Sequence, residues 1–248
     1  MPPAKTIVKK AKRRRKSPAA KIRKSSRPQN PDAQPQEFPL SHATLRAMYD
    51  AMLESRLWAQ SRNVAPVISE ATAIATATVL HRIDTLAAPA DGRTLYPVVH
   101  PETAIIPLEI AKITIACNSA KQNRHSAVIA ICPEDAFRSA SFQELMEDAR
   151  SRAWPLVCVV LTNSFFNPRA AIPEIDVDGH DAVAIFRVVS ESVRRARNHR
   201  GPAIVHAHNA TNTQMPDPLG DPLIRFQRYL AAKGLTTEKI HVLHTAGN

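Results

Sequence analysis

Glycine is scarce in this 248-residue chain. It occurs six times, and no glycine lies between Gly92 and Gly179. Glycines let a backbone approach phosphate oxygens and point N–H groups at them, so the middle of the chain has no glycine-rich phosphate loop. Apolar runs near eighteen residues are missing as well, and we therefore expect no membrane-spanning helix. The apolar fraction of 44% is still sufficient for a good core.

Cysteine is also rare. The three cysteines, Cys117, Cys132 and Cys158, are an odd number and lack the spacing of a metal site. Two of them fall in apolar runs that read as buried strands. We therefore expect inert thiols packed in a core, a reducing compartment and a cytoplasmic location.

The net charge of +11 belongs to one segment. The first 36 residues hold 12 Lys or Arg and one acidic residue, whereas the remainder holds 21 of each sign. Residues 1–39 are rich in Lys, Arg, Pro and Ser, which predicts a disordered basic tail ahead of an α/β domain at 40–248. The tail has three open interpretations: a solvated segment, a weak contact with nucleic acid or an anionic surface through residues 5–27, or an organelle-targeting address.

Two continuous apolar runs, Ala127 to Cys132 and Leu156 to Leu161, predict strands buried on both faces. Apolar residues at helical spacing lie between them, with Ser141 and Glu144 placed as a capping box and Pro155 as a stop. This is one βαβ unit. The ligand crevice of such a sheet lies at the carboxyl ends of its strands, which here are Pro133-Glu134-Asp135 and Thr162-Asn163-Ser164.

The flanking sequence predicts further elements by its hydrophobic periodicity and by its helix start and stop signals. We expect helices at Ser41 to Ala59, at Ser69 to Ile83, from Asp181 to the Gly201-Pro202 step, and at Asp221 to Lys233. A strand should begin at Ala203, and Leu86 to Pro101 should be a loop. Pro107 to Cys117 is an apolar stretch for which the leading proline favours a helix.

Five landmarks in this order resemble one family: the helix stripe Leu45 to Leu57, Ser69-Glu70-Ala71, the βαβ unit, Asp176 to Asp181, and Asp221 to Leu230. The family is the alpha subunit of the thiamine-diphosphate-dependent dehydrogenase component of 2-oxo acid dehydrogenase complexes. The resemblance implies a transketolase-like α/β fold with a mostly parallel sheet and helices on both faces. It also implies oxidative decarboxylation of a 2-oxo acid and assembly with a beta-type subunit or as a homo-oligomer.

The family's cofactor motif is Gly-Asp-Gly followed by Asn-Asn, and Phe142-Gln143-Glu144 fixes its register. The motif then falls on Pro133-Glu134-Asp135 and Thr162-Asn163. The resemblance therefore implies that thiamine diphosphate contacts Glu134, Asp135, Asn163 and Phe165, and that Mg²⁺ is bound by Glu134, Asn163 and the backbone carbonyl of Phe165. It assigns no catalytic residue.

This chain departs from the family at the diphosphate itself. Pro133 has no N–H to offer, and Asp135 adds a negative charge beside another. The family's Tyr-Arg clamp and Gly-His-Ser loop have no counterpart here. Two functions follow: an alpha subunit with impaired cofactor binding, or a pseudoenzyme retained for binding or scaffolding.

Other reactive side chains have ordinary explanations. Glu134 and Asp135 could be an acid–base pair, but a Pro-Glu-Asp strand end is more typical of a turn. His206 and His208 share a strand face as a partly solvated pair, and a metal there would need a third ligand. Hydrolase chemistry has little support, because Ser139, Ser141 and Ser164 have no histidine nearby in sequence.

Limited proteolysis provides the first test. Because residues 1–39 have no core-forming pattern, protease should trim the chain to about residues 37 to 41 and leave a folded, near-neutral domain. Mass spectrometry of the protected fragment measures the boundary. A stable fragment that keeps residues 10 to 20 would contradict the predicted boundary.

Overall fold

The structure is a computed structural model, and it describes residues 40–62, 69–89, 103–123, 125–163, 171–209 and 220–235. The predicted tail lies outside these residues and stays a prediction. Among the helices of the described residues, none is long and apolar enough to cross a membrane.

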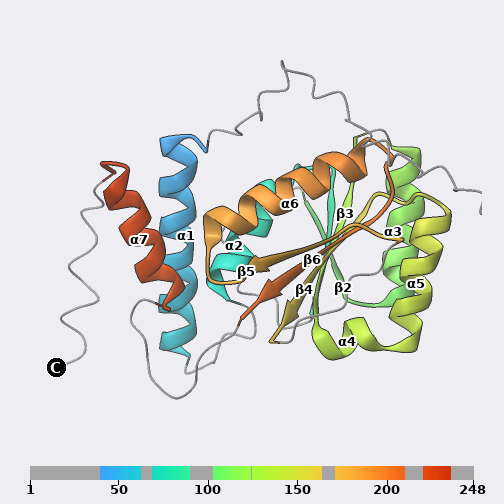
Figure 1. Cartoon of the computed structure of the whole chain (residues 1–248), viewed down its shortest axis with the longest axis horizontal. Coiled ribbons are helices and arrows are strands. Elements are labelled where there is room, and N and C mark those ends of the chain that lie inside the picture. The colour runs from blue at the N-terminus through green and yellow to red at the C-terminus, as the bar shows by residue number, and fades with distance from the viewer. Residues whose placement is uncertain are drawn as a thin grey trace, which may run out of the picture. The chain divides into compact units, whose positions relative to one another are not determined.

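The core of the fold is a parallel sheet of six strands in the order β2-β1-β3-β4-β6-β5 (Figure 1). The strands are β1 (Thr85–Ala88), β2 (Ala104–Pro107), β3 (Val128–Pro133), β4 (Leu156–Thr162), β5 (Glu174–Asp178) and β6 (Ala203–His208). Every described strand pair is parallel. The predicted α/β class with a parallel sheet is therefore confirmed.

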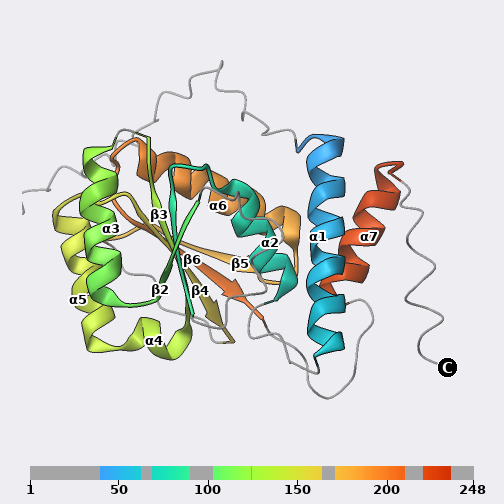
Figure 2. The same ribbon diagram turned by 180° about the vertical axis from the view of Figure 1, so that it is seen from behind.

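Helices cover both faces of this sheet, as Figures 1 and 2 show from opposite sides. One face carries α2 (Glu70–Val79) and α6 (Ala182–Arg197), with α1 (His42–Ser61) and α7 (Pro222–Ala232) packed against α2. The other face carries α3 (Ile110–Gln122), α4 (Glu134–Arg138) and α5 (Ala140–Ser151). Two hydrophobic cores result, one on each face.

The central strands divide their side chains between these cores. Val128, Ala130 and Cys132 of β3 belong to the core under α3 and α5, whereas Ile129 and Ile131 belong to the core under α2 and α6. This alternation is the two-residue period of a strand. The continuous apolar runs were thus correctly interpreted as strands buried on both faces, and all seven residues of β4 are buried.

Three short strands depart from the sequence-based expectation. Leu86 to Pro101 was predicted as a loop, but β1 occupies its first residues, and residues 90–102 lie outside the described part. Pro107 ends strand β2 instead of opening a helix, and α3 begins at Ile110. The missing N–H of a proline is tolerated there because β2 is an edge strand. The edge strand β5 was also missed, because five residues with only two apolar side chains carry a weak strand signal.

The predicted starts of three helices are confirmed. Ser41, Asp181 and Asp221 cap α1, α6 and α7, and each side chain accepts a hydrogen bond from the first turn. The Ser141 capping box was wrong, because Ser139 caps α5 and accepts from Phe142 N at 3.3 Å. The turn predicted at Pro133-Glu134-Asp135 is instead the last residue of β3 followed by the first turn of α4.

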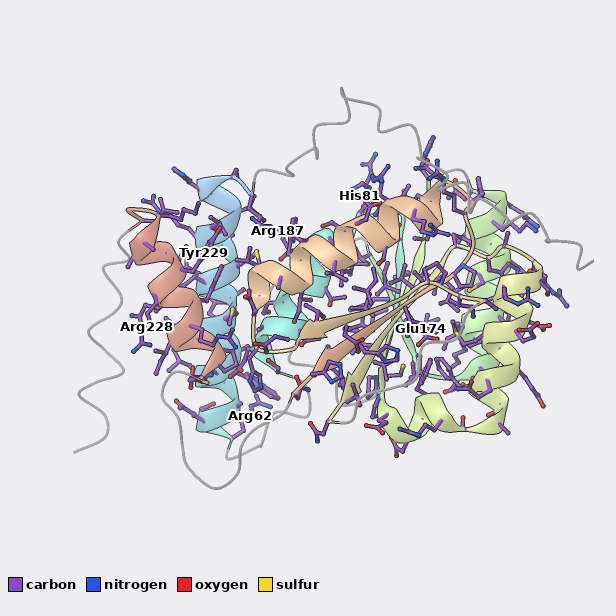
Figure 3. The ribbon with its side chains drawn as sticks, viewed as in Figure 1. Arg62, His81, Glu174, Arg187, Arg228 and Tyr229 are labelled. Atoms are coloured by element: carbon purple, nitrogen blue, oxygen red, sulfur yellow. The ribbon has the colours of Figure 1, made fainter. Side chains whose placement is uncertain are left out.

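A buried carboxylate joins three elements at the amino end of the sheet. The side chain of Asp84 is fully buried and accepts hydrogen bonds from His81 N at 2.7 Å and Ala127 N at 2.8 Å. It also forms an ion pair with Arg197 from the last turn of α6; Figure 3 labels His81 near α6. Asp84 thereby fixes the end of α6 to the starts of β1 and β3.

Replacing Asp84 with asparagine should destabilise the fold strongly. Asp84→Asn leaves the half-buried Arg197 without its charge partner, and breaking one side of a buried pair typically costs about 3–5 kcal/mol. Urea unfolding measures the change. The control is Glu191→Gln on the same helix, where both partners of the Glu191–Arg194 pair are exposed and the expected loss is below about 1 kcal/mol. Equal losses in both variants would contradict the role of Asp84.

Candidate functional site

A cleft of about 530 Å³ lies at the carboxyl edge of the sheet. It is lined by Ser69, Glu70, Pro133, Glu134, Leu161, Thr162, Asn163, His180, Asn209 and Pro222. These residues lie at the ends of β3 and β4, just after β5 and β6, and at the starts of α2 and α7. The cleft is thus where the sequence placed the ligand crevice.

The connections of the strands account for this position. The helix between β3 and β4, α5, packs on one face, and the helix between β5 and β6, α6, packs on the other. Strands β4 and β6 are neighbours in the sheet. The helices that lead into these two strands, α5 and α6, therefore cover opposite faces at adjacent positions. Crevices in open α/β sheets form at such switch points.

Glu134 connects the two strand ends at the floor of the cleft. Thr162 Oγ1 donates to Glu134 Oε2 at 2.6 Å, and Arg138 Nε donates to Glu134 Oε1 at 2.9 Å. The hydrogen bond from Thr162, followed by contributions from Arg138 and the backbone of Asn163, lowers the pKa of Glu134 despite partial burial. Glu134 is therefore an ionised side chain whose two oxygens both have partners.

Of the four cofactor residues implied by the resemblance, two meet in the cleft. Glu134 and Asn163 both line it. Asp135 is exposed in the first turn of α4 and is not among the lining residues. Phe165 lies outside the described residues, as does Ser164.

Two of the described residues at the implied motif positions fit a Mg²⁺-diphosphate group poorly in this arrangement. In the register that the resemblance implies, Pro133 stands where a backbone N–H would face phosphate, and proline has no N–H. Both oxygens of Glu134 are already engaged. Within the part of the chain that the structure describes, no group of three His, Cys, Asp or Glu side chains is arranged to hold a metal ion.

Sequence reasoning missed the ion pairs behind the cleft. Arg56 of α1 donates from Nε to Glu70 Oε1 at 2.8 Å and from Nη1 to Asp221 Oδ2 at 2.6 Å. Burial opposes the positive charge, but the two carboxylates outweigh it and raise the pKa of Arg56. Arg56 therefore joins α1 to the starts of α2 and α7. No local pattern reveals this, because Asp221 lies 165 positions from Arg56.

The landmark Asp176 to Asp181 has a structural explanation at Gly179. A Cβ on Gly179 would lie 2.2 Å from Asn209 Oδ1 and 2.9 Å from the carbonyl oxygen of His208. Gly179 N donates to that carbonyl at 2.8 Å, and Thr72 Oγ1 donates to the Gly179 carbonyl at 2.9 Å. Only glycine permits this approach, which seats the turn after β5 against β6.

The histidines of β6 pair with carboxylates of β5. His206 Nε2 lies 3.1 Å from Glu174 Oε2, and His208 Nε2 lies 2.7 Å from Asp176 Oδ1; Figure 3 labels Glu174 on this edge strand. The prediction of two partly solvated histidines is wrong for His206, which is 1% exposed. The reason is that its face of β6 packs against Phe137 of α4.

The remaining nucleophile candidates have structural roles. Ser139 caps α5 and donates to the carbonyl of Ala136, and Ser141 lies exposed in the same helix. All three cysteines are buried, as expected for inert packing. Burial raises the pKa of Cys117 to about 12, so its thiolate is not accessible at neutral pH.

Comparison with known proteins gives a distant relationship. No family model matches the chain. It is 25% identical over 158 residues to "Pyruvate dehydrogenase E1 component subunit alpha" from two strains of Staphylococcus epidermidis, a match that covers 50% of this chain and 43% of each relative. The chain thus matches less than half the length of those curated relatives. This similarity agrees with the resemblance drawn from the five landmarks.

A solved structure with a related description was also found. It is an enzyme from Mycobacterium smegmatis described as thiamin diphosphate-dependent, with 14% identity and a TM-score of 0.41. The overlap covers 57% of this chain and 32% of that one.

The hydrogen bond from Thr162 should control the titration of Glu134. Because folding lowers the pKa of Glu134, its stabilising contribution is complete above the unfolded pKa, about 4.3, and is lost as the pH falls below that value. Thr162→Val should raise the pKa of Glu134 toward the ordinary value, and carboxyl ¹³C NMR titration measures the shift. Arg138→Met should also raise this pKa, because Arg138 contributes both a hydrogen bond and its charge, and an unchanged pKa in Thr162→Val would contradict this assignment.

Proposed function

We propose that this chain is an alpha-type subunit related to the thiamine-diphosphate-dependent component of 2-oxo acid dehydrogenase complexes, with impaired cofactor binding. The observation that carries the proposal is the meeting of Glu134 and Asn163 in one cleft at the carboxyl ends of β3 and β4. These are the positions that the resemblance assigns to the cofactor motif. The distant similarity to the pyruvate dehydrogenase alpha subunit supports the same family.

The impairment has a local cause. Phosphate binding to a backbone requires N–H groups, and Pro133 removes one where β3 meets α4. Asp135 adds a carboxylate to the first turn of α4, next to Glu134. Each charge-assisted hydrogen bond lost is worth roughly 1.5–3 kcal/mol.

Assembly is part of the proposal. The related alpha subunit is named as a subunit of a larger component, and we infer a beta-type partner or a second copy of this chain. Oxidative decarboxylation of a 2-oxo acid would then depend on what such a partner contributes to the cleft.

A second candidate function is non-catalytic binding or scaffolding. It is favoured by the ion pair between Arg138 and Glu134, 2.8 Å between Arg138 Nη2 and Glu134 Oε1, together with the bond from Thr162. A carboxylate that is satisfied in this way has no need of a metal ion. In this case the fold is retained for its surfaces.

Titration calorimetry with thiamine diphosphate and Mg²⁺ distinguishes the impaired alpha subunit from the scaffolding function. The chain alone should bind with a dissociation constant of about 1 mM or weaker, because two or three charge-assisted bonds are missing. The double variant Pro133→Gly with Asp135→Gly should bind more tightly, whereas Asp148→Asn, an exposed charge on α5, should have no effect.

The outcomes separate the candidates as follows. Tightening in the double variant, or on addition of a beta-type subunit, supports the impaired alpha subunit. No binding in either, in a folded protein, supports the scaffolding function. Micromolar binding by the unmodified chain would contradict the proposed impairment.

A further inference from the structure

One wall of the cleft carries an incompletely paired carboxylate. The side chain of Glu70 is 8% exposed, and Arg56 engages only its Oε1. Among the described residues, no hydrogen bond reaches Oε2. Glu70 lines the cleft, so Oε2 is an acceptor that a ligand with a hydrogen-bond donor could use there.

Two more polar atoms in the same walls lack partners. Ser69 Oγ and Asn209 Oδ1 are buried, and neither has a hydrogen-bond partner in the described part of the chain. Both residues line the cleft. Native proteins leave few buried polar atoms unsatisfied, so these two atoms, in the same lining as Glu70, indicate a missing donor.

The charge of the residues that line the cleft also favours a ligand that donates hydrogen bonds. Glu70 and Glu134 both line the cleft, and no lysine or arginine is among its described lining residues. Their partners, Arg56 and Arg138, bind these carboxylates without lining the cleft. A phosphate group has only acceptor oxygens and negative charge at neutral pH, whereas an amino group donates hydrogen bonds. The cleft is therefore complementary to the second and not to the first.

We propose that the cleft binds a small organic cation with N–H donors, anchored on Glu70, in preference to phosphorylated ligands. This rests on the proposed function in that it assigns a ligand class to the same cleft. A cleft of 530 Å³ lies within the usual range for small-molecule sites. Glu70 is the anchor, and Ser69 and Asn209 accept the remaining hydrogens.

Thiamine and thiamine diphosphate are matched probes for this preference. Both have a positively charged ring and an amino group, and they differ only in the diphosphate. Calorimetric titration of the full chain in Mg²⁺-free buffer should give tighter binding of thiamine, by about tenfold or more. Thiamine diphosphate should gain little when Mg²⁺ is added, because Glu134 is already engaged.

Glu70→Gln tests the anchor. It removes the negative charge and keeps the size, while Arg56 retains Asp221 at 2.6 Å. Thiamine binding should weaken about tenfold or more, as expected for loss of a charge-assisted hydrogen bond. If this variant fails to fold in a thermal melt, Ser69→Ala serves instead, because the Ser69 hydroxyl is one of the proposed acceptors and makes no cap hydrogen bond to α2.

Asp221→Asn is the matched control. It removes an equal charge from the same Arg56, but Asp221 is not among the residues that line the cleft. Asparagine also preserves the cap of α7. Thiamine binding should stay within about threefold of the unmodified chain. Equal weakening in both variants would show that Arg56 acts through the fold, which overturns the anchor role of Glu70.

The comparison of thiamine with thiamine diphosphate either supports or overturns the proposed preference for a cation. Tighter binding of thiamine diphosphate than of thiamine would overturn this inference and leave the alpha-subunit proposal standing. Failure of thiamine to bind at millimolar concentration would also overturn it, and failure of both probes would favour the scaffolding function. Preference for thiamine, lost in Glu70→Gln and kept in Asp221→Asn, is the supporting result.

Discussion

Burial of β3 and β4 on both faces is the constraint on which the rest of the structure depends. Two helical layers cover these strands, so a polar side chain in their middle would lose water without gaining partners. Polar groups therefore collect where the strands end, and Glu134, Thr162 and Asn163 meet there. The position of the cleft follows from the core, whereas its chemistry depends on a few residues at the strand ends.

Two arginine networks place the helices around this sheet. Arg197 pairs with Asp84 at the amino end of the strands, and Arg56 joins Glu70 to Asp221 at the carboxyl end. Each arginine connects elements far apart in sequence. At the carboxyl end the same pairing gives Glu70 a second role, because one of its oxygens remains available to the cleft.

Local patterns predicted the elements that local interactions determine. The apolar runs of β3 and β4, the stripes of α1, α6 and α7, and the starts of α6 and α7 at Asp181 and Asp221 follow from the spacing of apolar residues and from helix-start signals. The short strands β1, β2 and β5 did not, because four or five residues carry little periodicity and their pairing is set by neighbours distant in sequence. Similarly, the position of Glu134 and Asn163 in one cleft was predictable from the βαβ unit, whereas the Arg56 network and the His206–Glu174 pair require the tertiary structure.

The strand ends can change chemistry without changing the fold. Pro133 completes β3, stands before α4 and is only partly buried. Glu134 gains Thr162 and Arg138 as partners, so its charge is compensated without a metal ion. A glycine at position 133 would restore an N–H but add flexibility to the unfolded chain. The present sequence therefore combines an intact parallel-sheet core with a cleft whose unsatisfied oxygens require hydrogen-bond donors, and this combination favours a cationic ligand over a diphosphate.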